Sequence, residues 1–240
     1  MVPDIDGKLH HFTNVGLYDG LFVMQDTESK TLWNHVTGEA LYGPLVRHSL
    51  GPARNLLQMN VKQALAMDAK MQVAISDRIY FAGGRQFGSA GGPPNGGTRQ
   101  HGPDPNAEMG DRFVPTLGKE DQRRPRMELG LGVWTSTTHR YYPLASIREH
   151  DGAFIDQLDG RKVLIFVNSE TNTPAALFVN ASTAKMQGGE IRLDNGAVMR
   201  DGVLLDRGGK RQLVERPQQV FSRWYGFALT FPGCEVFGER

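Results

Sequence analysis

The stretch Asp26 to Leu45, DTESKTLWNHVTGEALYGPL, is the most informative part of this chain. Asp and Thr at the end of a strand accept backbone N–H bonds in a turn, and Thr37-Gly38 is typical of a hairpin turn. On that interpretation Trp33 fills the core of a small sheet. The stretch therefore predicts a compact, β-rich domain.

Composition supports a globular chain with many turns. The 240 residues are enough for one large domain or two small ones, and 39% are hydrophobic against 22% charged. The 29 Gly and 13 Pro residues favour short strands and turns over a helical bundle. Because the net charge is only +1, no strong field attracts nucleic acid or anionic lipid, and we expect neither as a partner.

Cysteine content and hydrophobic patterning limit the disulfide chemistry and the cellular compartments that we expect for the protein. The single cysteine, Cys234, excludes an intrachain disulfide and a thiolate metal cluster, and we expect a buried structural thiol. The N-terminus, MVPDIDGKLHHF, lacks the pattern of a signal peptide. No apolar run approaches the roughly 18 residues of a membrane span. We expect a soluble protein, either cytoplasmic or a mature exported form.

The sequence predicts a mainly β fold (β-rich α+β) of two related sub-lobes, each with short antiparallel strands and one helix. Residues 1–81 form the first sub-lobe, residues 82–126 a connector, and residues 127–240 a second sub-lobe packed on the first. In the first sub-lobe, Asp19-Gly20 predicts a hairpin turn. Asn60 and Gln63 resemble a capping box before a helix over 61–70, and residues 72–75 follow as a strand.

The connector is rich in Gly and Pro without a regular period, which predicts a long exposed loop. Its length exceeds that of ordinary loops, so it is either functional or mobile. The charged run KEDQRRPR over 119–126 is mixed in sign, which indicates a solvated stretch rather than a nucleic-acid patch.

The second sub-lobe begins with a predicted strand pair over 129–134 and 139–144. Asp159-Gly160 predicts a hairpin turn before a central, buried strand over 163–167. Pro217 suits the first turn of a helix that carries Phe221 and Trp224, and Pro232-Gly233 ends it. Further strands are expected over 176–179, 190–193, 197–199, 203–205 and 234–237.

The two sub-lobes show the same order of features, which suggests an internal duplication. Each has a Gly-Ala step, at Gly38-Glu39-Ala40 and at Gly196-Ala197, followed by short strands, a helix and a last strand. Gly38 lies 35 residues before Val73, and Gly196 lies 40 before Val236. The polar cluster over 26–29 has no counterpart in the second half.

The same residues carry a resemblance to a known family. The sequence MQDTES over 24–29, with Leu32-Trp33, TGEA over 37–40 and Gly43-Pro44-Leu45, resembles the prokaryotic family named domain of unknown function 3179. Later stretches agree: Leu131-Gly132-Val133, Tyr142-Pro143-Leu144, the region of Trp224, and Glu149-His150-Asp151. We expect the chain to begin downstream of a segment with a Cys-Pro-Leu-Cys-like motif in longer members. The resemblance implies architecture and no particular activity.

The first motif could form a pocket lined by Asp26, Thr27, Ser29, Trp33 and Glu39. Its carboxylates would serve proton transfer or cation binding, and Trp33 would be a stacking wall. The alternative is that these residues only build a turn and a core. Both interpretations stay open at the level of sequence.

No metal motif is visible in the spacing of the histidines, so a divalent metal would need ligands distant in sequence. His35, His150 and Asp151, with Glu39, are the candidates for such a site. His10 and His11 face opposite sides of a strand, so at most one of them can enter a shared site. The sequence lacks Gly-x-Ser-x-Gly and a phosphate-binding loop, and we predict no other cofactor.

Two classes of function remain. The first is a non-catalytic binding or assembly module, in which residues 82–126 dock on a protein partner or a second copy of the chain. The second is an enzyme, with or without a metal, whose pocket includes Asp26, Trp33, Glu39 and His150. The absence of a compact metal or nucleophile motif favours the first class.

Overall fold

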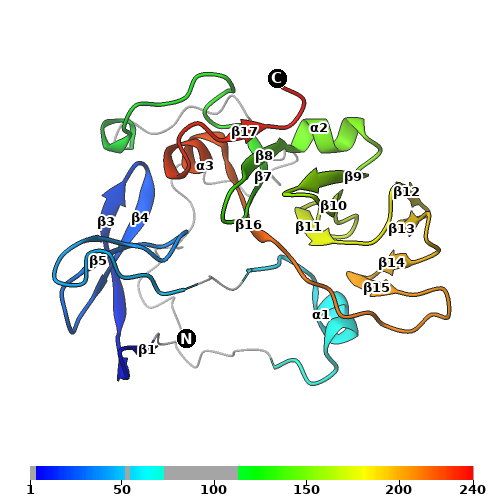
Figure 1. Cartoon of the computed structure of the whole chain (residues 1–240), viewed down its shortest axis with the longest axis horizontal. Helices are drawn as coiled ribbons and strands as arrows, with labels where there is room; N and C mark the ends of the chain where they lie inside the picture. The colour runs from blue at the N-terminus through cyan, green and yellow to red at the C-terminus, as the bar shows by residue number, and fades with distance from the viewer. Residues whose placement is uncertain (1–3, 52–54, 73–112, 240) are drawn as a thin grey trace, which may run out of the picture.

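The computed structural model describes residues 4–51, 55–72 and 113–239, and it is strand-rich with few helices (Figure 1). The predicted mainly β class is confirmed. Within the described residues the helices are α1 (Val61–Met67), α2 (Leu144–Glu149), α3 (Trp224–Thr230) and the 3-10 helix η1 (Val114–Thr116). None of these is long and apolar enough to cross a membrane.

We keep the names first sub-lobe (residues 1–81) and second sub-lobe (residues 127–240) for these parts of the chain; the division into domains stays a prediction. The described strands of the first sub-lobe include a four-stranded antiparallel meander in the order β3-β4-β5-β6. Its strands, with the short pair that precedes them, are β1 (Asp4–Ile5), β2 (Lys8–Leu9), β3 (Phe12–Tyr18), β4 (Leu21–Asp26), β5 (Leu32–Asn34) and β6 (Ala40–Tyr42). The predicted turn joins β3 to β4, and both Asp19 (φ 52°) and Gly20 (φ 68°) have the positive φ that this tight turn requires.

The second sub-lobe stacks three sheets. The outer one has the order β16-β7-β8-β17, the middle one β11-β10-β9, and the third β12-β13-β14-β15. The first of these holds β7 (Leu129–Trp134), β8 (His139–Pro143), β16 (Gln218–Arg223) and β17 (Glu235–Val236), with β17 parallel to β8. The others hold β9 (Ala153–Leu158), β10 (Arg161–Val167), β11 (Pro174–Phe178), β12 (Ala184–Gln187), β13 (Glu190–Leu193), β14 (Val198–Arg200) and β15 (Val203–Leu205).

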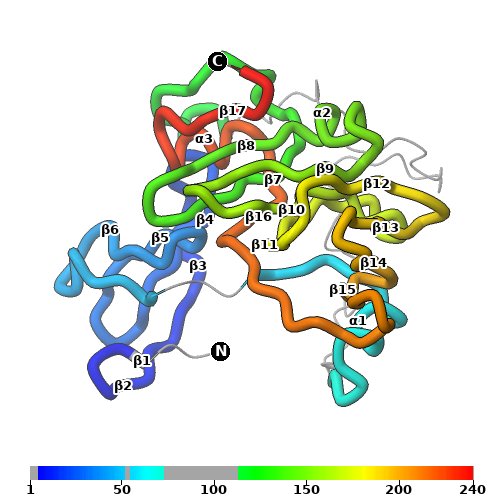
Figure 2. The backbone as a smooth tube through the Cα atoms, turned by 45° about the vertical axis from the view of Figure 1, so that its right-hand side comes forward, coloured from blue at the N-terminus to red at the C-terminus, as the bar shows by residue number. Residues whose placement is uncertain are grey.

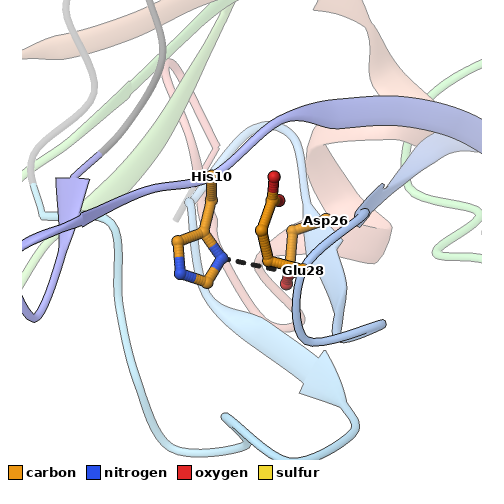
Figure 3. A group of neighbouring side chains, drawn as sticks. All are labelled: His10, Asp26 and Glu28. Carbon is orange, nitrogen blue, oxygen red and sulfur yellow. Dashed lines mark hydrogen bonds and ion pairs between the residues drawn. The ribbon is translucent and has the colours of Figure 1, made fainter.

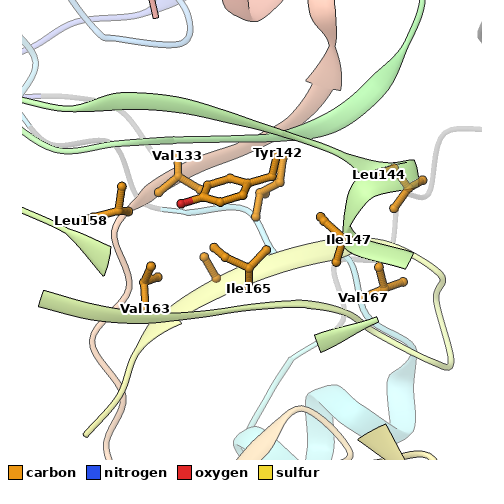
Figure 4. Close-up of a cluster of buried hydrophobic side chains, with 10 residues drawn as sticks. Val133, Tyr142, Leu144, Ile147, Leu158, Val163, Ile165 and Val167 are labelled. Atoms are coloured by element: carbon orange, nitrogen blue, oxygen red, sulfur yellow. The ribbon is translucent and has the colours of Figure 1, made fainter. Parts of the chain in front are cut away.

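Strand β10 lies at the centre of the second sub-lobe, as its apolar sequence predicts. Alternate side chains of a strand point to opposite faces. Val163 and Ile165 therefore enter the core shared with β7 and β8, whereas Leu164 and Phe166 enter the core shared with β13 and β14. Figure 4 shows the first of these cores between its two sheets. The turn before β10 uses Asp159-Gly160, as predicted.

The outer face of β7 is made of glycine and is covered by α3. A Cβ atom added at Gly132 would overlap the Phe227 ring, and one at Gly130 would overlap Tyr141. Leu131 and Val133 point the other way, into the core. The alternation of glycine and large residues in LGLGV thus lets a helix lie close on one face of a strand that is packed on the other.

Two helix predictions for the second sub-lobe need correction. The helix expected from Pro217 is wrong at its start, because residues 218–223 form β16, which pairs with β7 over six residue pairs. Only residues 224–230 are helical. The sub-lobe also holds α2, which follows Pro143 in place of a strand ending at Leu144, so it has two helices and not one. Residues 218–223 form a strand and not a helix because they pair with β7, which is distant in sequence.

Helix α1 begins at the predicted capping box, which Asn60 and Gln63 form reciprocally, and it ends at Met67 rather than at residue 70. It lies against the second sub-lobe, since α1 contacts β15 and Gln63 donates to Asn168 at 2.9 Å. The strand predicted over 72–75 falls largely outside the described residues.

The end of the predicted connector, over 113–126, is bound to the second sub-lobe. The indole of Trp224 donates to the Asp121 carbonyl at 2.7 Å, and Arg123 reaches the carbonyl of Cys234 at 2.8 Å. Lys119, Gln122, Arg123 and Pro125 are exposed, as predicted for a solvated stretch, but the charged run also makes ion pairs and contacts with the second sub-lobe. The part over 82–112 lies outside the described residues, so its predicted exposure is not addressed.

The internal duplication stays a prediction. Both sub-lobes contain a four-stranded antiparallel meander. However, Gly38 lies between the third and fourth strands of the first, whereas Gly196 lies between the second and third strands of the other. The Gly-Ala steps therefore do not occupy equivalent places.

Candidate functional site

Asp26 is the centre of a buried hydrogen-bond network, the Asp26 network, formed with His10, Ser29, Thr31 and Trp33. Its side chain is 0% exposed. One carboxylate oxygen accepts from the Ser29 backbone N–H at 2.5 Å and faces His10 Nδ1 at 3.1 Å. The other accepts from the Ser29 hydroxyl at 2.6 Å and from the Trp33 indole at 2.8 Å. The four contacts use the full acceptor capacity of a carboxylate.

These contacts keep Asp26 ionised in spite of its burial. Burial alone would raise the pKa of its carboxyl, but donation from Ser29, Trp33 and His10 holds the pKa well below its usual range. Because the carboxylate is then an acceptor only, His10 is the donor through Nδ1–H. The network extends to residue 45, whose backbone N–H donates to the Thr31 hydroxyl at 3.2 Å.

His10, Asp26 and Glu28 are the one group in the described residues whose ligand atoms lie within metal-binding distance of one another, all within 4.8 Å (Figure 3). Each member already has partners, however. Glu28 accepts from the backbone and ring of His11, at 2.8 and 2.7 Å, and this contact lowers its pKa to about 2. A cation here would have to displace donors from Asp26, so the geometry favours a structural network.

The other predicted pocket residues lie outside this network. Thr27 is exposed and donates its backbone N–H to the carbonyl of His11 at 2.8 Å. Glu39 is also exposed, and its carboxylate lies 3.5 Å from the Thr37 hydroxyl in the turn before β6. Of the five residues predicted to line one pocket, the structure brings Asp26, Ser29 and Trp33 together, in a buried network rather than around a cavity.

The metal candidates distant in sequence do not gather in one place. His35 donates its Nδ1–H to the Phe22 carbonyl at 2.8 Å, in the first sub-lobe. The His150 ring packs on Phe154 and Phe237 in the second, with ring centroids 4.9 and 5.5 Å apart. Asp151 occupies a tight turn with a φ of 55°. The divalent metal stays a prediction for metal analysis to test.

A cleft of about 330 Å³ lies where segments of the two sub-lobes meet, and we call it the Arg216 cleft. Segment 55–59 and α1 form one wall, and β7, β11 and β16 form the other; Figure 2 shows the segment passing beside β16 on its way to α1. Its apolar lining includes Leu57, Met59, Leu131, Phe166, Val220 and Phe221. Volume and lining are those of a small-molecule site.

Amide side chains fix the walls of this cleft. Gln219 is buried and binds both the N–H and the carbonyl of Ala176, at 2.7 and 2.9 Å, which joins β16 to β11. Asn55 donates to the carbonyl of Pro217 at 2.8 Å and accepts from the N–H of Gln219 at 3.0 Å. These groups are therefore occupied in holding the cleft open.

Cys234 behaves as predicted for a structural thiol. It is buried beside α3 in the cluster with Tyr141 and Trp224. Burial raises the pKa of its thiol to about 11, so the reactive thiolate is scarce at neutral pH.

These features define a strand-rich protein with a buried polar network and a separate cleft. The sequence profile of the family described as Protein of unknown function (DUF3179) matches residues 3–220, and the chain belongs to that family. Neither the curated proteins nor the solved structures contain a significant match to it.

Sequence reasoning missed two parts of these sites. His10 joins the Asp26 network; the sequence indicated only that at most one of His10 and His11 enters a shared site, and both lie between β2 and β3. Arg216 lines the cleft. Nothing local in its sequence marks it, because its surroundings come from strands that are distant in the chain.

Proposed function

We propose that this protein is a non-catalytic binding module that holds a small, largely apolar molecule in the Arg216 cleft. The observation that supports this is the chemistry of the lining. Apolar side chains dominate it, the ionisable side chains among its described residues are His35 and Arg216, and none is Asp, Glu, Ser, Cys, Lys or Tyr. Such a lining offers burial and orientation but lacks the paired acid and base of a typical hydrolytic site.

The enzyme alternative has less support from the geometry. It requires Asp26, Trp33, Glu39 and His150 around one substrate. Asp26 and Trp33 are fully buried and hydrogen-bonded to each other, whereas Glu39 is exposed in a turn. His150 packs against aromatic rings of the second sub-lobe. A buried carboxylate with four donors is poorly placed to accept a proton from substrate.

Binding of 1-octanol tests the proposal with a neutral apolar probe. We expect saturable binding of one molecule per chain by isothermal titration calorimetry, with affinity rising about fourfold per methylene along the alkanol series, since each buried CH₂ contributes about 0.8 kcal/mol. The variant Ala175→Phe places a ring in the cleft and is expected to abolish binding.

The matched control is Ala145→Phe, which adds the same ring at an exposed site on α2. It should bind 1-octanol like the wild type. Absence of saturable binding, or equal binding by the Ala175→Phe variant, would overturn the proposed function.

A further inference from the structure

Arg216 is a cation in the cleft without a carboxylate partner among the described residues. Its Nη1 donates to the carbonyl of Ala176 at 2.9 Å, and that oxygen also accepts from Gln219. In contrast, Arg161 pairs with Glu215 at 2.7 Å, and Arg124 with Glu128 at 2.6 Å. The contact of Arg216 with a neutral carbonyl leaves its charge uncompensated.

Burial distinguishes Arg216 further. Desolvation lowers the pKa of its guanidinium to about 10, whereas carboxylate neighbours raise the pKa of Arg124 and Arg161. The side chain is still charged at pH 7. A partly desolvated cation without a counter-ion is unfavourable, and an anion bound beside it removes that penalty.

The free edge of the guanidinium has a definite shape. With Nη1 engaged, Nε and Nη2 form a planar fork that has no partner in the described part of the chain. No buried side-chain nitrogen or oxygen in this part lacks a hydrogen bond, so the fork reaches accessible space. Two parallel N–H groups match the two oxygens of a carboxylate.

The charge of the cleft lining favours a ligand with a single negative charge. Arg216 is the one Lys or Arg among the described lining residues, and the remainder is mostly apolar. A phosphate dianion would be better served by several cations. We infer that the cleft binds a monocarboxylate with an apolar chain, its carboxylate paired with Nε and Nη2 of Arg216; this inference rests on the proposed function.

Comparison of octanoate with 1-octanol tests the inference at pH 7. The two probes share the alkyl chain and differ in the charged group. We expect the wild type to bind octanoate at least about tenfold more tightly than 1-octanol, because a bidentate charged hydrogen bond is added. In Arg216→Met that preference should vanish while 1-octanol binding remains. Arg216→Lys should recover part of it, since charge returns without the fork.

Arg211→Met is the matched control, because Arg211 is an exposed arginine outside the cleft. It should keep the preference for octanoate, and thermal melts should show that the Arg216 variants are folded. Equal affinity of the wild type for both probes, or an unchanged preference in Arg216→Met, would overturn the inference and leave the proposed function standing. If neither probe binds, the proposed function and the inference both fail.

Discussion

At Asp26 a fully buried carboxylate is surrounded by hydrogen-bond donors, none of them from a lysine or arginine. The donors come from a turn, a strand and the segment before β3, so one side chain ties together three parts of the first sub-lobe. This network explains the polar residues Asp26, Ser29 and Thr31 at the start of the stretch Asp26 to Leu45. Ser29 and Trp33 are placed to keep a buried charge hydrogen-bonded, which is the condition for tolerating it.

Substitution of Asp26 tests this role. Asp26→Asn replaces one acceptor oxygen with an NH₂ group that faces donors, and we expect it to lower the free energy of unfolding by about 2–4 kcal/mol. Urea denaturation followed by tryptophan fluorescence measures the loss. Glu28→Gln, at an exposed carboxylate of the same turn, is the control and should barely move the midpoint. Equal effects in the two variants would contradict the structural role.

The lowered pKa of Asp26 also predicts a pH dependence. Its folded-state pKa lies below the unfolded value of about 3.9, so its contribution to stability is complete above that value. The contribution is lost as pH falls from about 4 towards the folded-state pKa. Between about pH 4 and pH 2 the stability of the wild type should therefore fall more steeply than that of Asp26→Asn. Parallel curves from urea melts would rule this out.

Among the elements, the glycines of β7 determine how closely α3 can approach that strand. The glycines of β7 face the Phe227 and Tyr141 rings, and α3 lies directly on that face. The aromatic rings of Trp134, Phe227 and Phe231 continue the contact, with centroids 5.0 to 6.4 Å apart. The position of α3 thus depends on the absence of side chains at Gly130 and Gly132.

We predict that Gly132→Ala is strongly destabilising. The added methyl would overlap the Phe227 ring, and relief requires movement of α3, at a cost of about 1–3 kcal/mol or more. Gly16→Ala in β3 is the control, because a Cβ there meets no atom within 4 Å. Thermal unfolding by circular dichroism compares the two. A Tm for Gly132→Ala equal to that of the control would show that the contact is not tight.

Elements encoded by neighbouring residues were predictable from sequence. Asp19-Gly20 and Asp159-Gly160 specify their turns through positive φ, and the Asn60 cap specifies the start of α1. Residues 218–223 were misassigned because Pro217 is a local helix signal, whereas the residues of β7 that pair with β16 lie 84 to 94 positions earlier in the chain. The role of Arg216 was not predicted either, because its environment is made by β7, β11 and segment 55–59, which are distant in sequence.

At the scale of the whole molecule, specific contacts between described residues join the two sub-lobes. The turn at Asp19-Gly20 reaches segment 113–126, which is bound to the second sub-lobe, and the Gly118 backbone N–H donates to Asp19 at 2.8 Å. A Cβ on Gly20 would overlap Tyr225 of α3. Segment 55–67 contacts β15 and β16 of the second sub-lobe and forms one wall of the cleft. The cleft therefore depends on both sub-lobes holding their places.

The assembly alternative makes a prediction of its own. If residues 82–111 dock on a second copy of the chain, their replacement by a Gly/Ser segment of equal length should reduce an oligomer to a monomer slightly lighter than the 26.6 kDa wild-type chain. Size exclusion with light scattering gives the molar mass. The segment 113–126 is retained, because it is bound to the second sub-lobe. An unchanged molar mass would remove the support for this alternative.

The parallel pairing of β17 with β8 has a consequence for synthesis on the ribosome. β7 and β8 of the outer sheet are synthesised first, and the sheet is complete only when β16 and β17, up to residue 236, have followed. Until then Tyr141 lacks the cover of Trp224, Phe227 and Val236, and we expect the exposed surface to make the nascent chain a substrate for chaperones and proteases. Chains stalled at residue 215 should be digested rapidly by a protease, whereas released chains resist it. The second sub-lobe thus completes its folding only near the end of translation of these residues.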